Sequence, residues 1–220
     1  MEQAILTKDQ KSALALVGND AGIKDLFYLS GGTALAAFYL RHRYSDDLDF
    51  FTDSAAFPQL AIEQIAEKIR DAIGAVKIEY QRLYDRRIFF FQKPSGELKV
   101  EFTAYPFAAL HPRTPQDGIL VDSLEDLAAN KMMTLMDRVE SKDFADLYFL
   151  LHENHITLDR IRSLVEQKFH FAINPITLGA EFAKVRLITN LPRMIKPLTI
   201  QQLKDFFAEC AKQLRPDILA

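Results

Sequence analysis

The chain has 220 residues, of which 49% are hydrophobic and 26% are charged, so it is long enough to bury a core as one large domain or two small ones. Its single cysteine, Cys210, excludes an intramolecular disulfide framework and a cysteine-based zinc cluster, which is typical of a reducing compartment such as the cytoplasm. No stretch approaches the roughly 20 consecutive apolar residues of a membrane span, and the net charge of -3 gives no general attraction to polyanions.

The first part of the chain mixes strand and helix signals. Residues 27–29 are a short apolar run, a glycine pair at 31–32 interrupts it, and the Ala- and Leu-rich stretch 33–40 follows. This order predicts a strand, a turn and a helix. Residues 47–51 predict a further strand, and helical spacing of Leu and Ile predicts a helix over 57–69.

Three more strands are expected before the character of the sequence changes. They cover residues 76–80, 88–91 and 98–102, and the turns between them lie at 84–87 and 94–96. Short strands joined by such turns predict an antiparallel meander.

From residue 123 onward the pattern is helical. The expected helices are 123–138, 141–152, 158–169, 176–184 and 200–214. A Pro-rich stretch at 106–118 separates this part from the first, so we predict domains at 1–110 and 119–220. The expected fold class is α+β, followed by an all-α helical bundle.

Two carboxylates in the strand at 47–51 are the first chemical signal. Alternate side chains of a strand share a face, so Asp47 and Asp49 point to one side while Leu48 and Phe50 point to the core. Adjacent anions repel unless a cation lies between them, and Mg²⁺ prefers oxygen ligands. The pair therefore predicts a metal site; the alternative is the solvated face of an edge strand.

The glycine pair upstream strengthens this interpretation. Gly31 and Gly32 stand between a strand and the start of a helix, where backbone amides can cradle a phosphate, and Thr33 could add a hydroxyl. The alternative is a plain tight turn, which is commoner for such a pair in isolation.

A third carboxylate lies on a later strand. Glu101 is on the polar face, opposite Val100 and Phe102, and could complete the metal site. The alternative is a glutamate that is neutralised by Lys99 or by a cross-strand partner.

A lysine lies on the apolar side of the helix at 123–138. Lys131 falls within the stripe formed by Leu124, Leu127, Ala128 and Leu135. It needs an anionic partner there, which a triphosphate would supply; the alternative is that its stem snorkels along the apolar surface. Arg138 lies two turns further along the same edge.

Two aspartates of the next helix are candidate partners for these cations. Asp143 falls at the margin of the apolar face, so we expect it to point toward Lys131 or Arg138. A structural salt bridge is the favoured role, since buried charges are usually paired, and participation in catalysis is the second. Asp146 lies further round the helix, where we expect it to be solvated or to act as a cap.

Four groups of residues, in order along the chain, resemble the AbiEii-type nucleotidyltransferase toxin family. They are residues 31–36, residues 43–51, the set Lys131, Arg138, Lys142, Asp143 and Asp146, and residues 191–197. The resemblance covers nearly the whole chain. It implies a polymerase-β-like nucleotidyltransferase core with a mixed or antiparallel sheet, a helical C-terminal part, and a role as the toxin of a bacterial toxin–antitoxin or abortive-infection pair.

The resemblance also implies roles for individual residues. Asp47 and Asp49 would hold metal ions, Lys131 would bind the triphosphate, and Asp143 would be the acidic residue of the last motif. Related nucleotidyltransferases often place an aspartate where Glu101 stands, and the longer side chain would shift the metal or the acceptor. The residues predicted to bind the nucleotide are Gly31, Gly32, Thr33, Arg43, Ser45, Lys131 and Arg138.

The mechanism expected from these residues is two-metal phosphoryl transfer. Asp47, Asp49 and Glu101 would hold two Mg²⁺ ions, or Mn²⁺, of which one draws the acceptor oxygen toward the α-phosphate and the other neutralises the departing pyrophosphate. Glu101 would activate the acceptor hydroxyl. Helix-end amides and Lys131 would stabilise charge.

The acceptor is left open by the sequence. It would be an RNA end such as the tRNA 3′ terminus, or a protein hydroxyl, gripped by Arg82, Arg86 and Arg87 at a hairpin tip. Arg43 would contact phosphate or, with residues 41–42, form a basic rim for RNA. A toxin would also have a cognate antitoxin as partner. The alternative function is a catalytically inactive nucleotide- or partner-binding module on the same fold.

Overall fold

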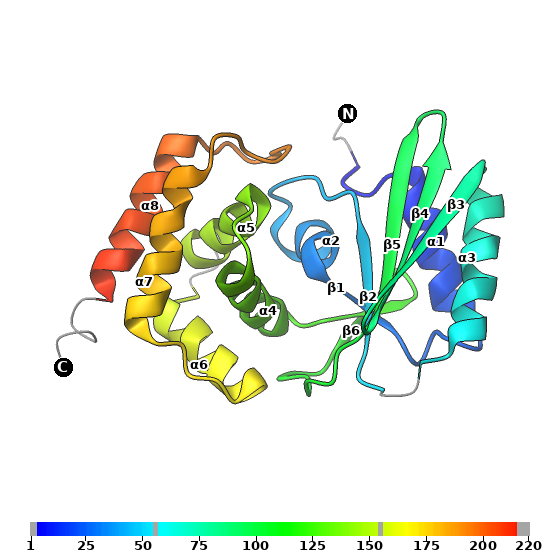
Figure 1. Cartoon of the computed structure of the whole chain (residues 1–220), viewed down its shortest axis with the longest axis horizontal. Coiled ribbons are helices and arrows are strands. Elements are labelled where there is room, and N and C mark those ends of the chain that lie inside the picture. Colours follow the sequence, from blue (N-terminus) through cyan, green and yellow to red (C-terminus); the bar gives the residue numbers. More distant parts are fainter. Residues whose placement is uncertain (1–3, 55–56, 154–155, 215–220) are drawn as a thin grey trace. The chain divides into compact units, whose positions relative to one another are not determined.

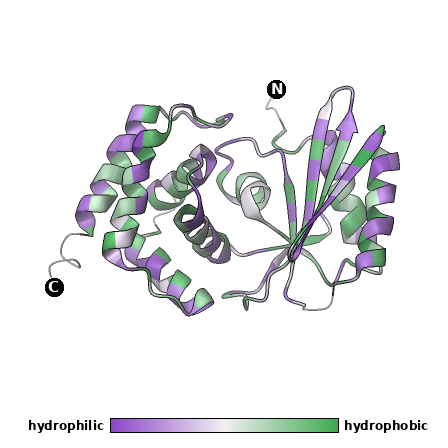
Figure 2. Cartoon of the chain, in the orientation of Figure 1, coloured by the Kyte–Doolittle hydropathy of each residue, from purple (hydrophilic) through white to green (hydrophobic). Residues whose placement is uncertain are grey.

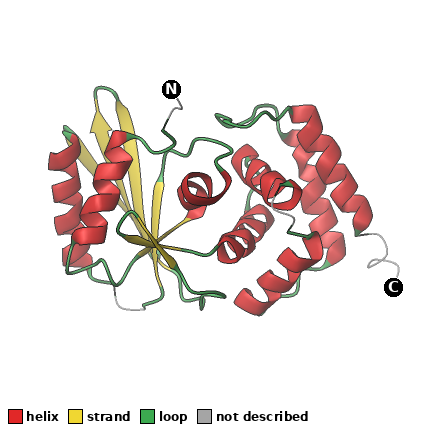
Figure 3. Ribbon diagram, turned by 180° about the vertical axis from the view of Figure 1, so that it is seen from behind, coloured by secondary structure: helices red, strands yellow, loops and turns green. Residues whose placement is uncertain are grey.

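The computed structural model describes residues 4–54, 57–153 and 156–214, and the chain divides into two compact units. Unit 1 consists of Met1–Tyr39 and Ser45–Ser123, and unit 2 consists of Leu40–Tyr44 and Leu124–Ala220. Unit 1 contains strands and helices, whereas the regular elements of unit 2 are helices (Figure 3). Among the described helices, none is long and apolar enough to cross a membrane.

Unit 1 is built around a mixed sheet with the strand order β3-β4-β5-β2-β1-β7-β6. The strands are β1 Tyr28–Ser30, β2 Leu48–Thr52, β3 Lys77–Leu83, β4 Arg86–Lys93, β5 Gly96–Ala104, β6 Thr114–Gln116 and β7 Ile119–Val121. β3, β4 and β5 form the antiparallel meander that the sequence predicts. β2 runs parallel to β5 and antiparallel to β1, which brings two distant parts of the sequence together in the middle of the sheet.

Helices cover both faces of this sheet. They are α1 Lys8–Asn19, α2 Gly31–Leu35 with its π-helical continuation η1 Ala36–Leu40, and α3 Gln59–Ile73. α1 and α3 pack against each other on one face, and α2 lies on the other (Figure 1). The sequence pattern did not predict α1, which begins at a capping box formed by Thr7 and Gln10.

The core of unit 1 lies between the sheet and its helices. Phe50 and Phe102 are register partners on β2 and β5, and their rings stack with centroids 5.2 Å apart. The strands and the helices of this unit both carry hydrophobic and hydrophilic residues (Figure 2). The apolar face of α3 differs from the expected one, because Leu60 is 69% exposed. The buried residues of α3 are Ile62, Ile65, Ala66, Ile69 and Ile73.

The helices of unit 2 follow the sequence closely. They are α4 Leu124–Asp137, α5 Ser141–His152, α6 Leu158–Phe169, α7 Pro175–Ala183, the 3-10 helix η2 Lys184–Leu187, and α8 Ile200–Gln213. The predicted helix ends lie within one residue of those observed. In its core, the ring of Phe207 lies 5.0 Å from that of Phe144 and 5.2 Å from that of Phe182.

The division of the chain differs from the predicted domains at 1–110 and 119–220. Residues 119–121 form β7, which pairs in parallel with β1, and the amide of Asp122 donates to the carbonyl of Leu29. The segment therefore lies in unit 1. A three-residue strand directly after a Pro-rich stretch is too short to show a period of two, so only its pairing identifies it.

Residues 40–44 also lie outside the unit that the sequence suggests. Arg43 forms an antiparallel bridge with Met194, the amide of Tyr44 donates to the carbonyl of Arg193, and the amides of Ile195 and Lys196 donate to the carbonyl of His42. These hydrogen bonds hold the segment in unit 2, although the chain on either side of it belongs to unit 1.

Candidate active site

The glycine turn and the carboxylate strand meet in unit 1. β1 and β2 are antiparallel, and Ser30 is the register partner of Asp49. Gly31 has a φ of 70°, and a Cβ atom at this position would clash with Oδ2 of Asp49. Glycine is therefore needed both for the left-handed backbone and for the space that the Asp49 carboxylate occupies.

A hydrogen bond fixes the second aspartate. The hydroxyl of Thr33, a buried residue at the start of α2, donates to the backbone carbonyl of Asp47. Nearby, the side-chain amide of Gln10 donates to the carbonyl of Ser45 at 2.8 Å. The Thr33 hydroxyl, which we predicted to contact phosphate, thus holds the chain that enters β2.

Parallel pairing of β2 with β5 adds Glu101 and Lys99 to this group. Glu101 is the register partner of Asp49, and Lys99 lies two residues earlier on the same face of β5. The ammonium nitrogen of Lys99 lies 3.4 Å from Oδ2 of Asp47 and 3.3 Å from Oε2 of Glu101. Burial acts to lower the pKa of Lys99, but the charges of Asp49, Asp47 and Glu101 outweigh it and raise that pKa.

Glu101 is held by a cation and a hydroxyl. Nε of Arg86 lies 2.5 Å from its Oε1, Nη2 of Arg86 lies 2.6 Å from its Oε2, and Thr103 donates to Oε1 at 2.8 Å. Burial acts to raise the pKa of Glu101, but the hydrogen bonds from Arg86 and Thr103 outweigh it and lower that pKa. The alternative drawn from the sequence, neutralisation by Lys99 or a cross-strand partner, describes this environment.

Metal-ligating side chains do not form a closed cage in the described part of the chain. No group of three His, Cys, Asp or Glu side chains there is arranged to hold a metal ion. Asp47 and Asp49 are both only partly buried, and the side chain of Asp47 is 37% exposed. A pair of carboxylates is a suitable partial ligand set for a hard divalent ion that takes its other ligands from substrate phosphates and water.

Unit 2 holds a second group of charges, centred on Asp146. Nζ of Lys131 lies 2.7 Å from Oδ2 of Asp146 and 3.1 Å from Oδ1 of Asp143. Arg43 binds both oxygens of Asp146, with Nε at 2.6 Å from Oδ1 and Nη2 at 2.9 Å from Oδ2. Arg138 donates to Oδ2 of Asp143 at 2.9 Å. The predicted salt bridges of Asp143 with Lys131 and Arg138 are thus present.

Asp146 corrects one expectation, because it is buried and not solvated. Burial acts to raise its pKa, but the charges of Lys131 and Arg43 outweigh burial and hold the pKa of Asp146 well below its usual value. Nε2 of His42 lies 2.7 Å from Oδ1 of the same carboxylate. The partners from residues 42–43 could not be inferred from helical spacing, since they lie about a hundred positions away in the sequence.

The predicted site residues therefore fall into two groups, each assembled within its own unit. In unit 1 the structure brings together Gly31, Gly32, Thr33, Ser45, Asp47, Asp49 and Glu101. In unit 2 it brings together Arg43, Lys131, Arg138 and Asp143. In the first group, the sequence did not reveal the contact of Lys99 with Asp47 or that of Arg86 with Glu101. In the second group, it did not reveal the contact of His42 with Asp146 or the burial of Asp146.

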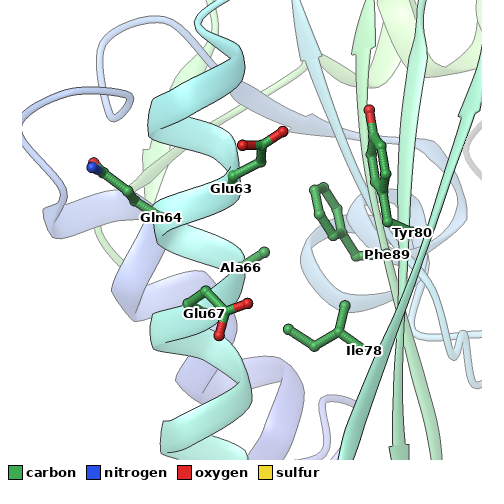
Figure 4. Close-up of a pocket in the computed structure, with 7 residues that line it drawn as sticks. All are labelled: Glu63, Gln64, Ala66, Glu67, Ile78, Tyr80 and Phe89. Carbon is green, nitrogen blue, oxygen red and sulfur yellow. The ribbon is translucent and has the colours of Figure 1, made fainter.

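A groove elsewhere in unit 1 contains none of these residues. It has a volume of about 460 Å³ and lies between α3 and the strands β3 and β4. Figure 4 shows its lining: Glu63, Gln64, Ala66 and Glu67 from the helix, and Ile78, Tyr80 and Phe89 from the strands. It carries no phosphate- or metal-binding pattern, so the candidate site remains the Asp47–Asp49 group.

Comparison with known proteins agrees with this geometry. Residues 14–219 match the family described as nucleotidyl transferase AbiEii toxin, type IV TA system. The protein aq_aa25 of Aquifex aeolicus (strain VF5) is 36% identical over 168 residues, which cover 74% of this chain and 76% of that protein.

Solved structures share the fold. JHP933 from Helicobacter pylori aligns with a TM-score of 0.60 at 19% identity, over 96% of this chain and 90% of that one. A second structure from H. pylori aligns with a TM-score of 0.58 at 20% identity, over 99% of this chain and 96% of that one. The expected α+β nucleotidyltransferase fold is confirmed, and the chain belongs to the AbiEii nucleotidyltransferase toxin family.

Proposed function

We propose that this enzyme transfers a nucleoside monophosphate from a nucleoside triphosphate to a hydroxyl group, in a reaction that depends on divalent cations. One observation carries the proposal: the Asp49 carboxylate lies against Gly31, the first residue of α2. The Asp49 carboxylate thereby lies beside the start of a helix, whose amides are suited to a phosphate, and the backbone carbonyl of Asp47 accepts a hydrogen bond from Thr33 of the same helix. Gly31, Gly32, Thr33 and Ser45 are the proposed phosphate-binding backbone.

The proposed metal ligands are Asp47 and Asp49, with Mg²⁺ as the preferred ion and Mn²⁺ as a substitute. Two ions bound there would supply Lewis-acid activation of the acceptor oxygen and neutralise charge on the departing pyrophosphate. Glu101 fits less well as the third ligand, because its oxygens accept from Arg86 and Thr103. A role of Glu101 as ligand or base requires Arg86 to release it; until then Glu101 anchors Arg86 and Lys99.

Cations of the second group are proposed to bind the triphosphate. Arg138 is the best candidate, since its side chain is 41% exposed, whereas Arg43 and Lys131 are buried against Asp146. Asp143 holds Arg138 and Lys131 in fixed positions, which lowers the reorganisation needed when negative charge develops on a substrate.

The acceptor is proposed to be an RNA end, such as the tRNA 3′ terminus, or a protein hydroxyl. The type IV TA description of the family supports a biological role as the toxin of a bacterial toxin–antitoxin or phage-defence system. A cognate antitoxin would then be a partner, and the site of action would be the cytoplasm.

One observation favours a second candidate function, a nucleotide- or partner-binding module without catalysis. Lys99 already pairs with Asp47, one of the two proposed metal ligands, and with Glu101. A module of this kind would bind a triphosphate with little dependence on divalent cations.

A labelling experiment tests the two candidates. The full chain is incubated with each labelled nucleoside triphosphate, Mg²⁺ and bacterial RNA or lysate, beside the double variant Asp47→Asn, Asp49→Asn and the control Asp71→Asn on α3. We expect the native chain and the control to label a macromolecule, and the double variant to lose at least about a hundredfold in rate, as for removal of charge stabilisation in a transition state. Triphosphate binding without transfer, unchanged in the double variant, would contradict the catalytic proposal.

A further inference from the structure

We propose that Lys99 is the resident counter-cation of the Asp47–Asp49 pair, so that a divalent ion binds these aspartates only in competition with the Lys99 ammonium group. This inference rests on the proposed function, because it concerns the same two carboxylates. It adds a residue that neither the sequence motifs nor the family resemblance assigns to the site.

The position of Lys99 follows from strand register. Lys99 and Glu101 lie on one face of β5, and parallel pairing with β2 places Asp49 on that face beside Glu101. Asp47 lies two residues before Asp49, at the entry to β2, so the Lys99 ammonium lies between a carboxylate from each segment, at 3.4 Å from Asp47 and 3.3 Å from Glu101. Its side chain is 22% exposed, which limits screening of these charges by water.

The negative charges of three neighbouring carboxylates explain why a cation is needed at position 99. Asp47, Asp49 and Glu101 would repel one another on adjacent strands. Arg86 binds both oxygens of Glu101 and so compensates that carboxylate. Lys99 contacts Asp47 as well as Glu101, and the negative charge of Asp49 also acts on it.

The chemistry of the two cations makes Lys99 the displaceable one. A guanidinium that donates two hydrogen bonds to one carboxylate is held in a fixed plane, as Arg86 is. A lysine ammonium is a point charge on a flexible stem, and neither of its distances here is that of a short hydrogen bond. Lys99 can withdraw from Asp47 without unfolding the strand that carries it.

Competition of this kind couples the metal to the nucleotide. A divalent ion alone must displace the ammonium from the aspartates. A triphosphate that arrives with the ion offers phosphate oxygens to both cations, so binding becomes favourable. The expected result is weak binding of the ion alone and strong binding of the ion together with the triphosphate.

Metal affinity without nucleotide tests the inference. Mn²⁺ binding to the full chain is measured by calorimetry and by electron paramagnetic resonance for the native protein, Lys99→Met and the control Lys93→Met, whose lysine pairs with Asp9 on α1. We expect Lys99→Met to bind Mn²⁺ at least about tenfold more tightly, because an opposite charge at this distance shifts an ionic equilibrium by that order. Lys93→Met should bind as the native protein does. Equal or weaker binding by Lys99→Met overturns the inference.

Two further variants test where the ion binds and whether the charge of Lys99 is the cause. Asp49→Asn in the Lys99→Met background should abolish the gain, which shows that the ion measured lies at these aspartates. Lys99→Arg keeps the charge and should bind Mn²⁺ no more tightly than the native protein does; a gain in Lys99→Arg equal to that in Lys99→Met overturns the inference. If Lys99→Met does not fold, Lys99→Gln is measured in its place.

Thermal unfolding gives a second readout that does not depend on transfer activity. Without divalent ions, Lys99→Met should melt at a lower temperature than the native chain, since the carboxylates lose their counter-cation. Saturating Mn²⁺ should raise the melting temperature of Lys99→Met more than that of the native chain. If Lys99→Met binds Mn²⁺ more tightly but the native chain transfers no nucleotide, the proposed function alone is refuted. If the native chain transfers nucleotide but Lys99→Met binds Mn²⁺ with unchanged affinity, this inference alone is refuted.

Discussion

Asp146 is the residue on which most of the buried charge of unit 2 depends. Its carboxylate has no exposed surface, and it binds Arg43 through both oxygens, Lys131 through Oδ2 and His42 through Oδ1. A buried carboxylate is tolerated only when its charge is compensated and its oxygens accept hydrogen bonds. Because the partners come from two segments, this one residue ties residues 42–43 to α4 and α5.

His42 makes the stability of unit 2 sensitive to pH. Burial lowers the pKa of His42 from its usual 6.5, against the opposing effect of Asp146. The neutral ring donates a hydrogen bond through Nε2 to Asp146. In the described structure Nδ1 is buried without a hydrogen-bond partner, so a proton added there would find no acceptor. Arg43 and Lys131 also face the ring's carboxylate partner and disfavour a further positive charge.

We expect the free energy of unfolding to fall as the pH drops below about 6.5, by up to about 1.4 kcal/mol per pH unit. The unfolded chain takes up the proton at its ordinary pKa, whereas the folded chain takes it up only at lower pH, so acid favours the unfolded state. Urea unfolding of the native chain and of His42→Gln between about pH 7.5 and 5 measures this effect. The variant should show a smaller slope in that range; identical slopes would contradict the prediction.

At the scale of elements, apolar spacing identified the helices of unit 2 but not the strands at the end of unit 1. α4 to α8 each bury one face, so a period of 3.6 residues is visible in the sequence. β6 and β7 have three residues each. β7 pairs with β6 and, in parallel, with β1 from a distant part of the chain. A strand this short is recognised by its pairing with neighbouring strands and not by the hydrophobic pattern of its own residues.

Two helices of unit 2 are joined by an ion pair that the sequence did not reveal. Nζ of Lys168 on α6 lies 2.6 Å from Oδ1 of Asp126 on α4, and both side chains are at most 1% exposed. Each residue looks like an ordinary charged position of an amphipathic helix. Only the packing of α4 against α6 shows that the two charges meet in the interior.

We expect Lys168→Met to lower the free energy of unfolding by about 3 to 5 kcal/mol, because it removes the ammonium that neutralises a buried carboxylate. The double variant Asp126→Leu, Lys168→Met should recover most of that loss, since it removes both charges together. Lys212→Met, which breaks the exposed pair with Glu209, should change the free energy by about 1 kcal/mol or less. Denaturant unfolding compares the three; a double variant as unstable as Lys168→Met would argue against charge as the cause.

At the scale of the whole molecule, candidate site residues that are close in the sequence lie in different units: Arg43 belongs to unit 2, whereas Asp47 and Asp49 belong to unit 1. The glycine turn and the aspartates that the sequence singled out lie on neighbouring elements of unit 1, where Ser30 is the register partner of Asp49 and Asp49 lies against Gly31. The sequence could not reveal how Arg86 and Lys99 engage Glu101, which depends on the register of β4, β5 and β2. Nor could it reveal that Arg43 leaves unit 1, four residues before Asp47, to pair with Asp146 in unit 2.

The placement of residues 40–44 in unit 2 gives a prediction for the full chain. Arg43 lies in the sequence between parts of unit 1, but its side chain is buried against Asp146 of unit 2. Arg43→Met removes one cation from that carboxylate, a change that costs about 3 to 5 kcal/mol for a buried pair. Hydrogen exchange should therefore become faster for the slowest amides of α4 and α5 and stay unchanged for those of β4 and β5.

Arg82→Met, at an exposed position of β3, is the matched control and should leave exchange in both units unchanged. Faster exchange in the strands of Arg43→Met, with protected helices, would mean that residues 40–44 stabilise the sheet. Faster exchange confined to α4 and α5 would mean that a segment embedded in the sequence of unit 1 completes the charged core of unit 2. In that case the motif at residues 43–51, continuous in sequence, would serve two purposes: its first residue stabilises the helices, and its aspartates form the candidate metal site.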